Sequence, residues 1–199
     1  MGELTDPGTR GRLLRAAVRA YSDHGYLGAT TRRIAEAAGL NEVTLFRLFG
    51  SKDALVEQAV HAHAMGEPAA TLPSIPKNPD RELGRWCRSE IERLRCSRDL
   101  LRKCFAEAAD HPELVSDATR GMVGAGTALR NYVAALEDQG FKVGRTDRSA
   151  AIAMLLSVLF SDALGREDLS EIYALEASEA PAVYARVFLR ALGFARSPR

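Results

Sequence analysis

Four basic side chains occur within one short stretch of this sequence, residues 30–52. Guanidinium and ammonium groups bind phosphate anions and release the counterions that surround a nucleic acid. The whole chain has a formal net charge of only +1, which argues against a protein that coats nucleic acid of any sequence. The pattern therefore predicts that recognition of DNA is confined to this stretch. Its cations are Arg32, Arg33, Arg47 and Lys52.

Two short helices joined by a tight turn are predicted to position these cations. In a helix-turn-helix the second helix crosses close above the first, so one facing residue must be small and the turn needs a residue that tolerates positive φ. Ala35 and Gly39 meet these two requirements. Thr30 and Asn41 are good N-caps for the two helices, because each side chain can accept a hydrogen bond from an otherwise unpaired backbone N–H.

The apolar residues of this stretch fall on one face of each predicted helix. The first helix buries small and branched side chains, and the second carries an i, i+3, i+4 stripe that docks it on the rest of a domain. We expect the inward residues to be Ile34, Ala35 and Ala38 in the first helix and Leu45, Leu48 and Phe49 in the second, which leaves Glu42, Val43, Thr44, Phe46 and Arg47 pointing outward.

The flanking sequence supplies the other helices of such a unit. An Ala-x-x-x-Gly pair alone is weak evidence, because it occurs in many helical proteins. Here an amphipathic helix is predicted over Arg10–His24, ending at Gly25, and another begins at Lys52 and runs to Met65. The helix over Arg10–His24 supplies the third helix that such a unit needs.

These residues resemble the amino-terminal domain of tetracycline-repressor-type (TetR family) transcriptional regulators, and the similarity covers about residues 10–60. The motifs that carry it are Leu13-Leu14-x-Ala16-Ala17, His24-Gly25-Tyr26, Ala29-Thr30-Thr31-Arg32-Arg33-Ile34-Ala35, Ala38-Gly39-Leu40-Asn41 and Thr44-Leu45-Phe46-Arg47-Leu48-Phe49-x-Ser51-Lys52.

The resemblance implies a domain organisation and a function. A helix-turn-helix DNA-binding domain is expected over residues 1–56, and a larger helical ligand-binding and dimerisation domain over 57–199. A Pro-rich connection at 66–79 follows the last helix of the reading unit, and a link of that length is unusual for the family. The family's usual activity is repression by a homodimer that binds a palindromic operator and is released by a small-molecule effector.

The resemblance also implies roles for individual residues in DNA binding. Two positions depart from the family pattern: Phe46 replaces a tyrosine whose hydroxyl contacts a phosphate, and Leu48 replaces a frequent histidine. Both replacements remove a polar contact to the DNA backbone. The phosphate candidates are Thr30, Thr31, Thr44 and Lys52, Arg32 suits a guanine edge or a phosphate, the base-edge candidates are Glu42, Val43 and Arg47, and Arg33 and Phe46 complete the DNA-binding set.

Composition predicts an all-α protein. The chain has 199 residues, 46% hydrophobic and only 7% aromatic, and Ala, Leu, Arg and Glu recur at helical spacing. The amino terminus lacks an apolar signal core, and the longest apolar run, Ala150–Leu164, is interrupted by polar residues and too short to span a bilayer. We therefore expect a soluble, cytoplasmic protein with no membrane partner.

Cysteine and histidine spacing predicts neither a disulfide framework nor a metal site. The three cysteines, Cys87, Cys96 and Cys104, are odd in number and lack a C-x-x-C spacing, which favours reduced thiols. His61 and His63 lie two residues apart and face apart on a helix. We expect no metal and no cofactor.

The second domain is predicted to hold both the effector pocket and the dimer interface. The last two long helices have more apolar surface than a small helical bundle can bury, which indicates a subunit interface. The alternative is one self-contained bundle. Pocket candidates, chosen by side-chain type, are Trp86, Cys104, Phe105, Met122, Tyr132 and Phe160, and interface candidates are Leu155, Val158, Leu159, Val183, Val187 and Phe188.

Two other function classes were weighed. An enzyme is disfavoured, because the sequence contains no G-x-S-x-G, P-loop or H-E-x-x-H motif and no suggestive carboxylate pair. A helical interaction protein with a degenerate helix-turn-helix is the second alternative, since Phe46 and Leu48 have lost polar groups. If the protein shifts its own upstream DNA in a gel with a preference for sequence, it is a regulator. If it does not, the interaction protein is favoured.

Overall fold

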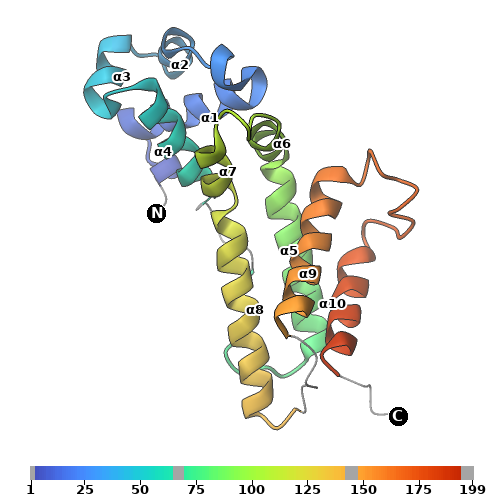
Figure 1. Ribbon diagram of the computed structural model, residues 1–199. Coiled ribbons are helices and arrows are strands. Elements are labelled where there is room, and N and C mark those ends of the chain that lie inside the picture. The colour runs from blue at the N-terminus through green and yellow to red at the C-terminus, as the bar shows by residue number, and fades with distance from the viewer. Residues whose placement is uncertain (1–2, 65–69, 142–147, 194–199) are drawn as a thin grey trace. The chain divides into compact units, whose positions relative to one another are not determined.

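A computed structural model describes residues 3–64, 70–141 and 148–193, and every regular element in these ranges is helical (Figure 1). The prediction of an all-α fold is confirmed. Contacts along the chain define two compact units: the first comprises Met1–Glu67 and Ser97–Gly121, and the second comprises Pro68–Cys96 and Met122–Arg199. The expected division after residue 56 differs from this one, because that position lies inside a helix of the first unit.

The first unit is built around one long helix that contacts most of the others. This helix, α1, packs against α2, α4 and α6, while α4 also packs against α7. Its apolar face, centred on Leu13, Leu14 and Tyr21, is fully buried. The elements of this unit are η1 (Glu3–Thr5), α1 (Thr9–Gly28), α2 (Thr31–Ala38), α3 (Glu42–Phe49), α4 (Lys52–Ala64), α6 (Arg98–Ala106) and α7 (Pro112–Ala118).

Helix α1 is interrupted where the sequence predicts its end. Gly25 has a φ of 69°, a left-handed conformation that favours glycine, and the helix resumes from there to Gly28. The backbone N–H of the next residue, Tyr26, donates to both carboxylate oxygens of Glu107, at 3.2 and 3.1 Å. A Cβ at Gly25 would lie 2.3 Å from that carboxylate, so space as well as φ restricts this position to glycine.

The second unit is a bundle of four helices, drawn in green, yellow, orange and red in Figure 1. Helix α5 (Pro79–Cys96) packs against both α9 (Arg148–Gly165) and α10 (Ala180–Ala191), which also contact each other. Helix α8 (Arg120–Asp138) is tied to α5 by the Tyr132 hydroxyl, which donates to Glu82 at 2.5 Å. A Cβ at Gly126 would meet the Leu156 side chain of α9 at 3.4 Å, so α8 and α9 approach closely at that glycine.

Helices α7 and α8 are separate and break at Thr119. The Thr119 hydroxyl donates to the Val115 carbonyl at 2.8 Å and so competes for an acceptor at the end of α7. Helix α6 ends at Ala106. The end of the helix expected at Met65, and residues 66–69 of the expected Pro-rich connection, lie outside the described residues.

Helix α9 is strongly apolar, although only part of it is buried within the chain. Among the described helices it alone is long and apolar enough to cross a bilayer, with a mean hydropathy of 1.4 over 18 residues, although the apolar run was expected to be too short. Only 33% of it is buried in the chain, and its buried side packs on α5 and α10. Its remaining apolar surface is therefore exposed in the single chain.

Thiol and metal chemistry contribute little to the described parts of the chain. All three cysteines are free, and burial raises the pKa of the Cys87 thiol to about 12 and that of Cys104 to about 11. Within the described ranges, no group of three or more His, Cys, Asp or Glu residues is arranged to hold a metal ion.

A buried carboxylate organises the end of the second unit. The Asp162 side chain is 1% exposed and accepts hydrogen bonds from Arg95 at 3.1 Å, from Arg166 at 3.0 Å and from the Tyr184 hydroxyl at 2.7 Å. Burial alone would raise the pKa of Asp162, but these donors outweigh it and the pKa is lowered. Arg166 also donates to the Leu175 carbonyl at 2.6 Å, so the cluster fixes the α9–α10 connection.

We predict that Asp162→Ala lowers the free energy of unfolding by about 2–3 kcal/mol. This is below the roughly 3–5 kcal/mol expected for a fully buried pair, because Arg95 retains access to water. Because the pKa of Asp162 is lower when folded, its contribution is complete above the unfolded pKa of about 3.9 and is lost as the pH falls through the folded value. Urea unfolding at pH 7 and at pH 3 checks both points.

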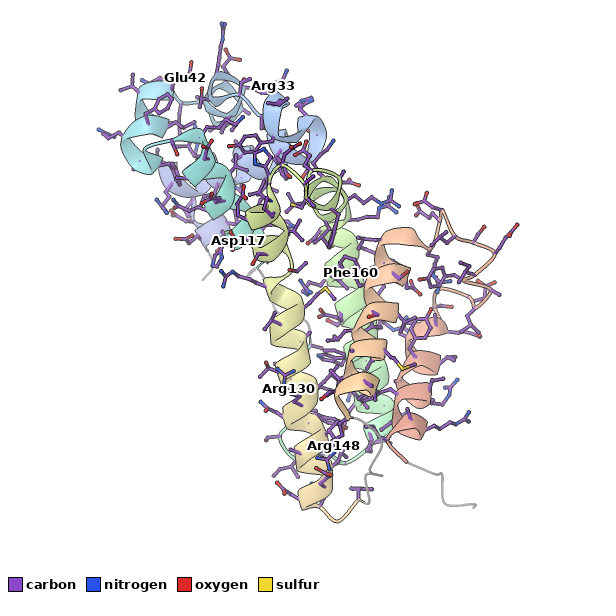
Figure 2. The ribbon with its side chains drawn as sticks, viewed as in Figure 1. Arg33, Glu42, Asp117, Arg130, Arg148 and Phe160 are labelled. Carbon is purple, nitrogen blue, oxygen red and sulfur yellow. The ribbon has the colours of Figure 1, made fainter. Side chains whose placement is uncertain are left out.

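Glu137→Ala is the matched control, because Glu137 forms a partly exposed ion pair with Arg148, labelled in Figure 2. It should cost less than about 1 kcal/mol. Equal losses in the two variants, or a loss at Asp162 that does not shrink at low pH, would contradict the assigned role of the buried carboxylate.

Candidate DNA-binding surface

The turn between α2 and α3 adopts the conformation that its residues predict. The Thr30 hydroxyl oxygen caps α2 by accepting from the Arg33 N–H at 3.2 Å. Gly39 has a φ of 64°, and the Leu40 N–H bonds back to the Ala35 carbonyl at 2.9 Å, which closes the end of α2. Ala35 itself is 2% exposed, as expected of the small facing position.

Side-chain contacts then fix α2 against α3. The Thr31 hydroxyl donates to the Glu42 carboxylate at 2.5 Å, joining the starts of the two helices. Arg12 of α1 donates to the carbonyls of Ala38 and Gly39, the latter at 3.3 Å. Figure 2 shows Glu42 and Arg33 on these neighbouring helices. The turn is therefore held by a backbone conformation, an interhelical hydrogen bond and an arginine from a third helix.

One face of α3 is left open to solvent. Val43 is 75% exposed and Phe46 is 47% exposed. Arg47 is exposed too, and its guanidinium makes no hydrogen bond or ion pair with the described parts of the chain. In the major groove, an apolar side chain can contact a thymine methyl and a guanidinium can bind a guanine edge. The exposed face of α3 offers both kinds of group side by side.

The predicted docking stripe of α3 is partly wrong. Leu45 is fully buried and Phe49 is 7% exposed, but Leu48 is 36% exposed and lies outside the docked face. With 3.6 residues per turn, Leu45 and Phe49 centre the buried face and Leu48 falls on its flank. Leu48 therefore stands on the edge of the open face of α3.

Several donors expected to contact phosphate are already engaged within the first unit. The Thr31 hydroxyl donates to Glu42, and the Thr44 hydroxyl donates to the Asn41 amide oxygen at 2.8 Å. The Lys52 ammonium donates to the Tyr26 carbonyl at 2.5 Å and lies 4.0 Å from the centre of the Tyr26 ring. Burial lowers the pKa of Lys52. Phosphate binding by these three side chains would require an exchange of partners.

Other members of the set keep their capacity to bind DNA. Thr30 uses its oxygen only as an acceptor, so its hydroxyl hydrogen can still be donated. Arg32 pairs with Glu36 at 2.9 Å, but both side chains are largely exposed and such a surface pair is easily exchanged. Arg33 donates to the Gly28 carbonyl at 2.8 Å. No DNA contact of these residues is tested by the structure, and each stays a prediction.

Tyr26 forms a cluster that sequence reasoning missed. Its hydroxyl donates to Asp53, its ring stacks on that of His111 at 3.6 Å between centroids, and its backbone N–H donates to Glu107. This cluster fixes the end of α1 against α4 and the α6–α7 connection. The partners are 27 to 85 residues away in sequence, so helical periodicity carries no signal for it.

The six pocket candidates do not gather in one unit. Cys104 and Phe105 belong to the first unit, where Cys104 is buried beside Tyr21 and Phe105 is 44% exposed. The others belong to the second unit: Trp86 and Tyr132 are buried, whereas Met122 and Phe160 are half-buried. Of the six, only Trp86 lines the groove formed by residues 70–77 and the first turns of α5.

Three of the six interface candidates are buried within the single chain. Leu155, Leu159 and Phe188 are at most 3% exposed, because α9 and α10 turn these residues toward α5 and toward each other. They cannot present an apolar surface to another subunit without unpacking. Exposed apolar surface is instead found at Val187, 55% exposed, and at Met154, 70% exposed; Val158 and Val183 are half-buried.

Comparisons with known proteins agree with this geometry. The family model of bacterial regulatory proteins, tetR family, matches residues 13–59, which contain the capped turn and the open face of α3. This part of the chain is therefore similar to the DNA-binding domain of tetR-family regulators, and the match supports a DNA-binding regulator.

The similarity extends beyond the reading unit. The regulator is 26% identical over 164 residues to YvkB of Bacillus subtilis, an uncharacterized HTH-type transcriptional regulator, covering 82% of this chain and 85% of that protein. It is 43% identical over 47 residues to the HTH-type transcriptional repressor AcnR of Corynebacterium glutamicum, covering 24% and 25%. The structure of Salmonella enterica GusR superposes with a TM-score of 0.69 at 20% identity, covering 96% of this chain and 100% of that one.

We predict that Gly39→Ala lowers the free energy of unfolding by about 1–2 kcal/mol, because a non-glycine residue is strained at a φ of 64°. Gly124→Ala is the matched control: Gly124 is helical, and a Cβ there meets no described atom within 4 Å. The control should gain up to about 1 kcal/mol from the better helix former. Urea unfolding of the two variants measures the contrast, and a neutral Gly39→Ala would show that the turn does not need its left-handed residue.

Proposed function

We propose that this regulator is a repressor that binds a palindromic operator as a soluble, cytoplasmic homodimer and is released by a small-molecule effector. The observation that carries the proposal is the open face of α3, where an unpaired arginine stands beside exposed apolar side chains on a helix fixed at its turn. Repression, rather than activation, is proposed because it is the family's usual activity and because AcnR is a transcriptional repressor.

On this proposal α3 enters the major groove and α2 is anchored on the DNA backbone. Arg47 and Val43 would read base edges, since their side chains are exposed and uncommitted. The first backbone N–H groups of α2, at Thr31 and Arg32, have no acceptor within the helix and lie at its positive end, which suits a phosphate. The Thr30 hydroxyl can donate to the same phosphate.

A homodimer would present two such faces to two half-sites. The exposed apolar residues of α9 and α10, Met154 and Val187, support an interface there, because an isolated chain leaves this surface uncovered. A symmetric dimer contacts successive major grooves when its reading helices are about 34–36 Å apart. An effector bound in the second domain would favour a dimer arrangement in which the two reading helices are a different distance apart. The dimer would then release the operator.

A second candidate function rests on the same face of α3. Phe46 and Leu48 are both exposed there and neither can donate to a phosphate. Exposed apolar side chains also suit contact with another protein, so a helical interaction protein that no longer reads DNA is the alternative. Electrophoretic mobility shift of the protein's own upstream DNA at low salt, against a scrambled duplex, separates the two functions.

We predict that Arg47→Ala weakens operator binding by about 1–3 kcal/mol while binding to random DNA changes little, because a base contact is lost. Fluorescence anisotropy with both duplexes measures the difference. Arg186→Ala, at an exposed position of α10, is the control and should bind as the wild type does. An equal loss on both duplexes would make Arg47 a phosphate contact, and no loss on either would remove it from the DNA surface.

We predict that Met154→Lys combined with Val187→Lys gives a folded monomer, because two buried, unpaired charges in each subunit oppose association. Multi-angle light scattering should give half the wild-type mass, with an unchanged circular dichroism spectrum. Val123→Lys on α8 is the control, since Val123 is 68% exposed but lies on another helix. A double variant that remains dimeric would place the interface elsewhere.

A further inference from the structure

The second unit contains a groove between the chain that precedes α5 and the first turns of α5. Its volume is about 600 Å³, within the range of small-molecule sites. One wall is formed by residues 70–77 and the other by α5 itself. The residues that line it are Ala70, Thr71, Pro73, Ile75, Lys77, Glu82, Arg85 and Trp86.

The groove has an apolar part. Trp86 lines it and is 3% exposed, so its indole is fixed by the packing of α5. Ile75 also lines it, from the segment before α5, and is 64% exposed, so it is open to contact with an apolar ligand. An apolar ligand body placed between them would remove Ile75 from water.

Among the described residues that line the groove, the one carboxylate already accepts three hydrogen bonds. Glu82 accepts the backbone N–H groups of Lys77 and Asn78 at 3.0 and 2.9 Å through one oxygen, and the Tyr132 hydroxyl at 2.5 Å through the other. Burial alone would raise the pKa of Glu82, but these hydrogen bonds and the nearby Arg85 outweigh it and the pKa is lowered. Glu82 is therefore an ionised structural group that holds the wall of the groove in place.

The cations of the groove are not similarly occupied. Within the described ranges, the side chains of Lys77 and Arg85 make no hydrogen bond or ion pair, although Arg85 is near enough to Glu82 to affect its pKa. Two cations and one carboxylate, which already accepts three hydrogen bonds, are among the described residues that line the groove. These residues thus carry an excess of one positive charge beside an apolar wall.

We propose that this groove binds an amphipathic organic anion, with its carboxylate between Lys77 and Arg85 and its apolar body between Ile75 and Trp86. The proposal rests on the effector response proposed above, because such a ligand would be the effector or its analogue. It gives the long Pro-rich connection a role, because residues 70–77 supply one wall of the site.

Trp86 provides the test, because it is the sole tryptophan of the chain. We would titrate the full-length protein with 4-phenylbutyrate and with its neutral isostere 4-phenylbutanamide, exciting tryptophan at 295 nm. The expected result is a saturable change in Trp86 emission, with the anion binding several-fold more tightly than the amide. Lys77→Gln and Arg85→Gln should each weaken anion binding about two- to fivefold, as for partly exposed charge pairs, and leave amide binding unchanged.

Arg186→Gln, on α10 and outside the groove, is the control and should bind the anion as the wild type does. Equal binding of anion and amide, a change in emission that does not saturate, or unchanged affinity in both groove variants would overturn the assignment. Operator binding is measured separately by anisotropy. If the protein binds the operator but not the anion, only this inference is contradicted. If it binds the anion but no operator, only the proposed function is contradicted.

Discussion

The conformation of the α2–α3 turn is the constraint on which the DNA-binding surface depends. Gly39 reaches a φ of 64° without strain, and the hydrogen bond from Thr31 to Glu42 then sets the start of α3 against the start of α2. Val43 and Arg47, i and i+4 on α3, share one exposed face, and the turn sets the direction of that face relative to α2. If the turn were flexible, ordering the two helices on DNA would cost free energy and lower the affinity for the operator.

The same contacts that stiffen the reading unit compete with DNA for donors. Thr31, Thr44 and Lys52 all donate internally, so hydroxyl and ammonium groups expected on phosphates serve the fold of the free protein. With Phe46 in place of the usual tyrosine, the proposed DNA-backbone contacts would fall to Thr30 and to the N-terminal amides of α2. Arg47 is then the main uncommitted cation on α3, and fewer phosphate contacts imply a shallower dependence of binding on salt.

The sequence was sufficient for the reading unit because its signals are local. Ala35, Gly39 and the two cap residues Thr30 and Asn41 determine backbone conformation within a few positions, and the structure has all four in their expected places. Contacts between distant segments could not be predicted in this way. The Tyr26 cluster brings together side chains from α1, α4 and the α6–α7 connection, which no periodic pattern links.

The late helices show a second limit of sequence patterns, since an apolar residue there can face the chain's own core or another subunit. Leu155 and Phe188 are apolar and buried within the chain, while Met154 and Val187 are equally apolar and exposed, and periodicity alone does not say which face is which. Side-chain type was equally ambiguous for the pocket: of the six candidates only Trp86 lines the groove. Its lining also needs Lys77 and Arg85, which composition gives no reason to select.

Methylation protection of the protein's own upstream DNA tests the central claim most directly, because dimethyl sulfate reports guanine N7 in the major groove and adenine N3 in the minor groove. If α3 is held by its turn in position to read the major groove, the dimer should protect guanine N7 in two patches about one helical turn apart. The Gly39→Ala variant should lose that protection before it unfolds. Protection of adenine N3 alone, or no protection at saturating protein, would contradict the account.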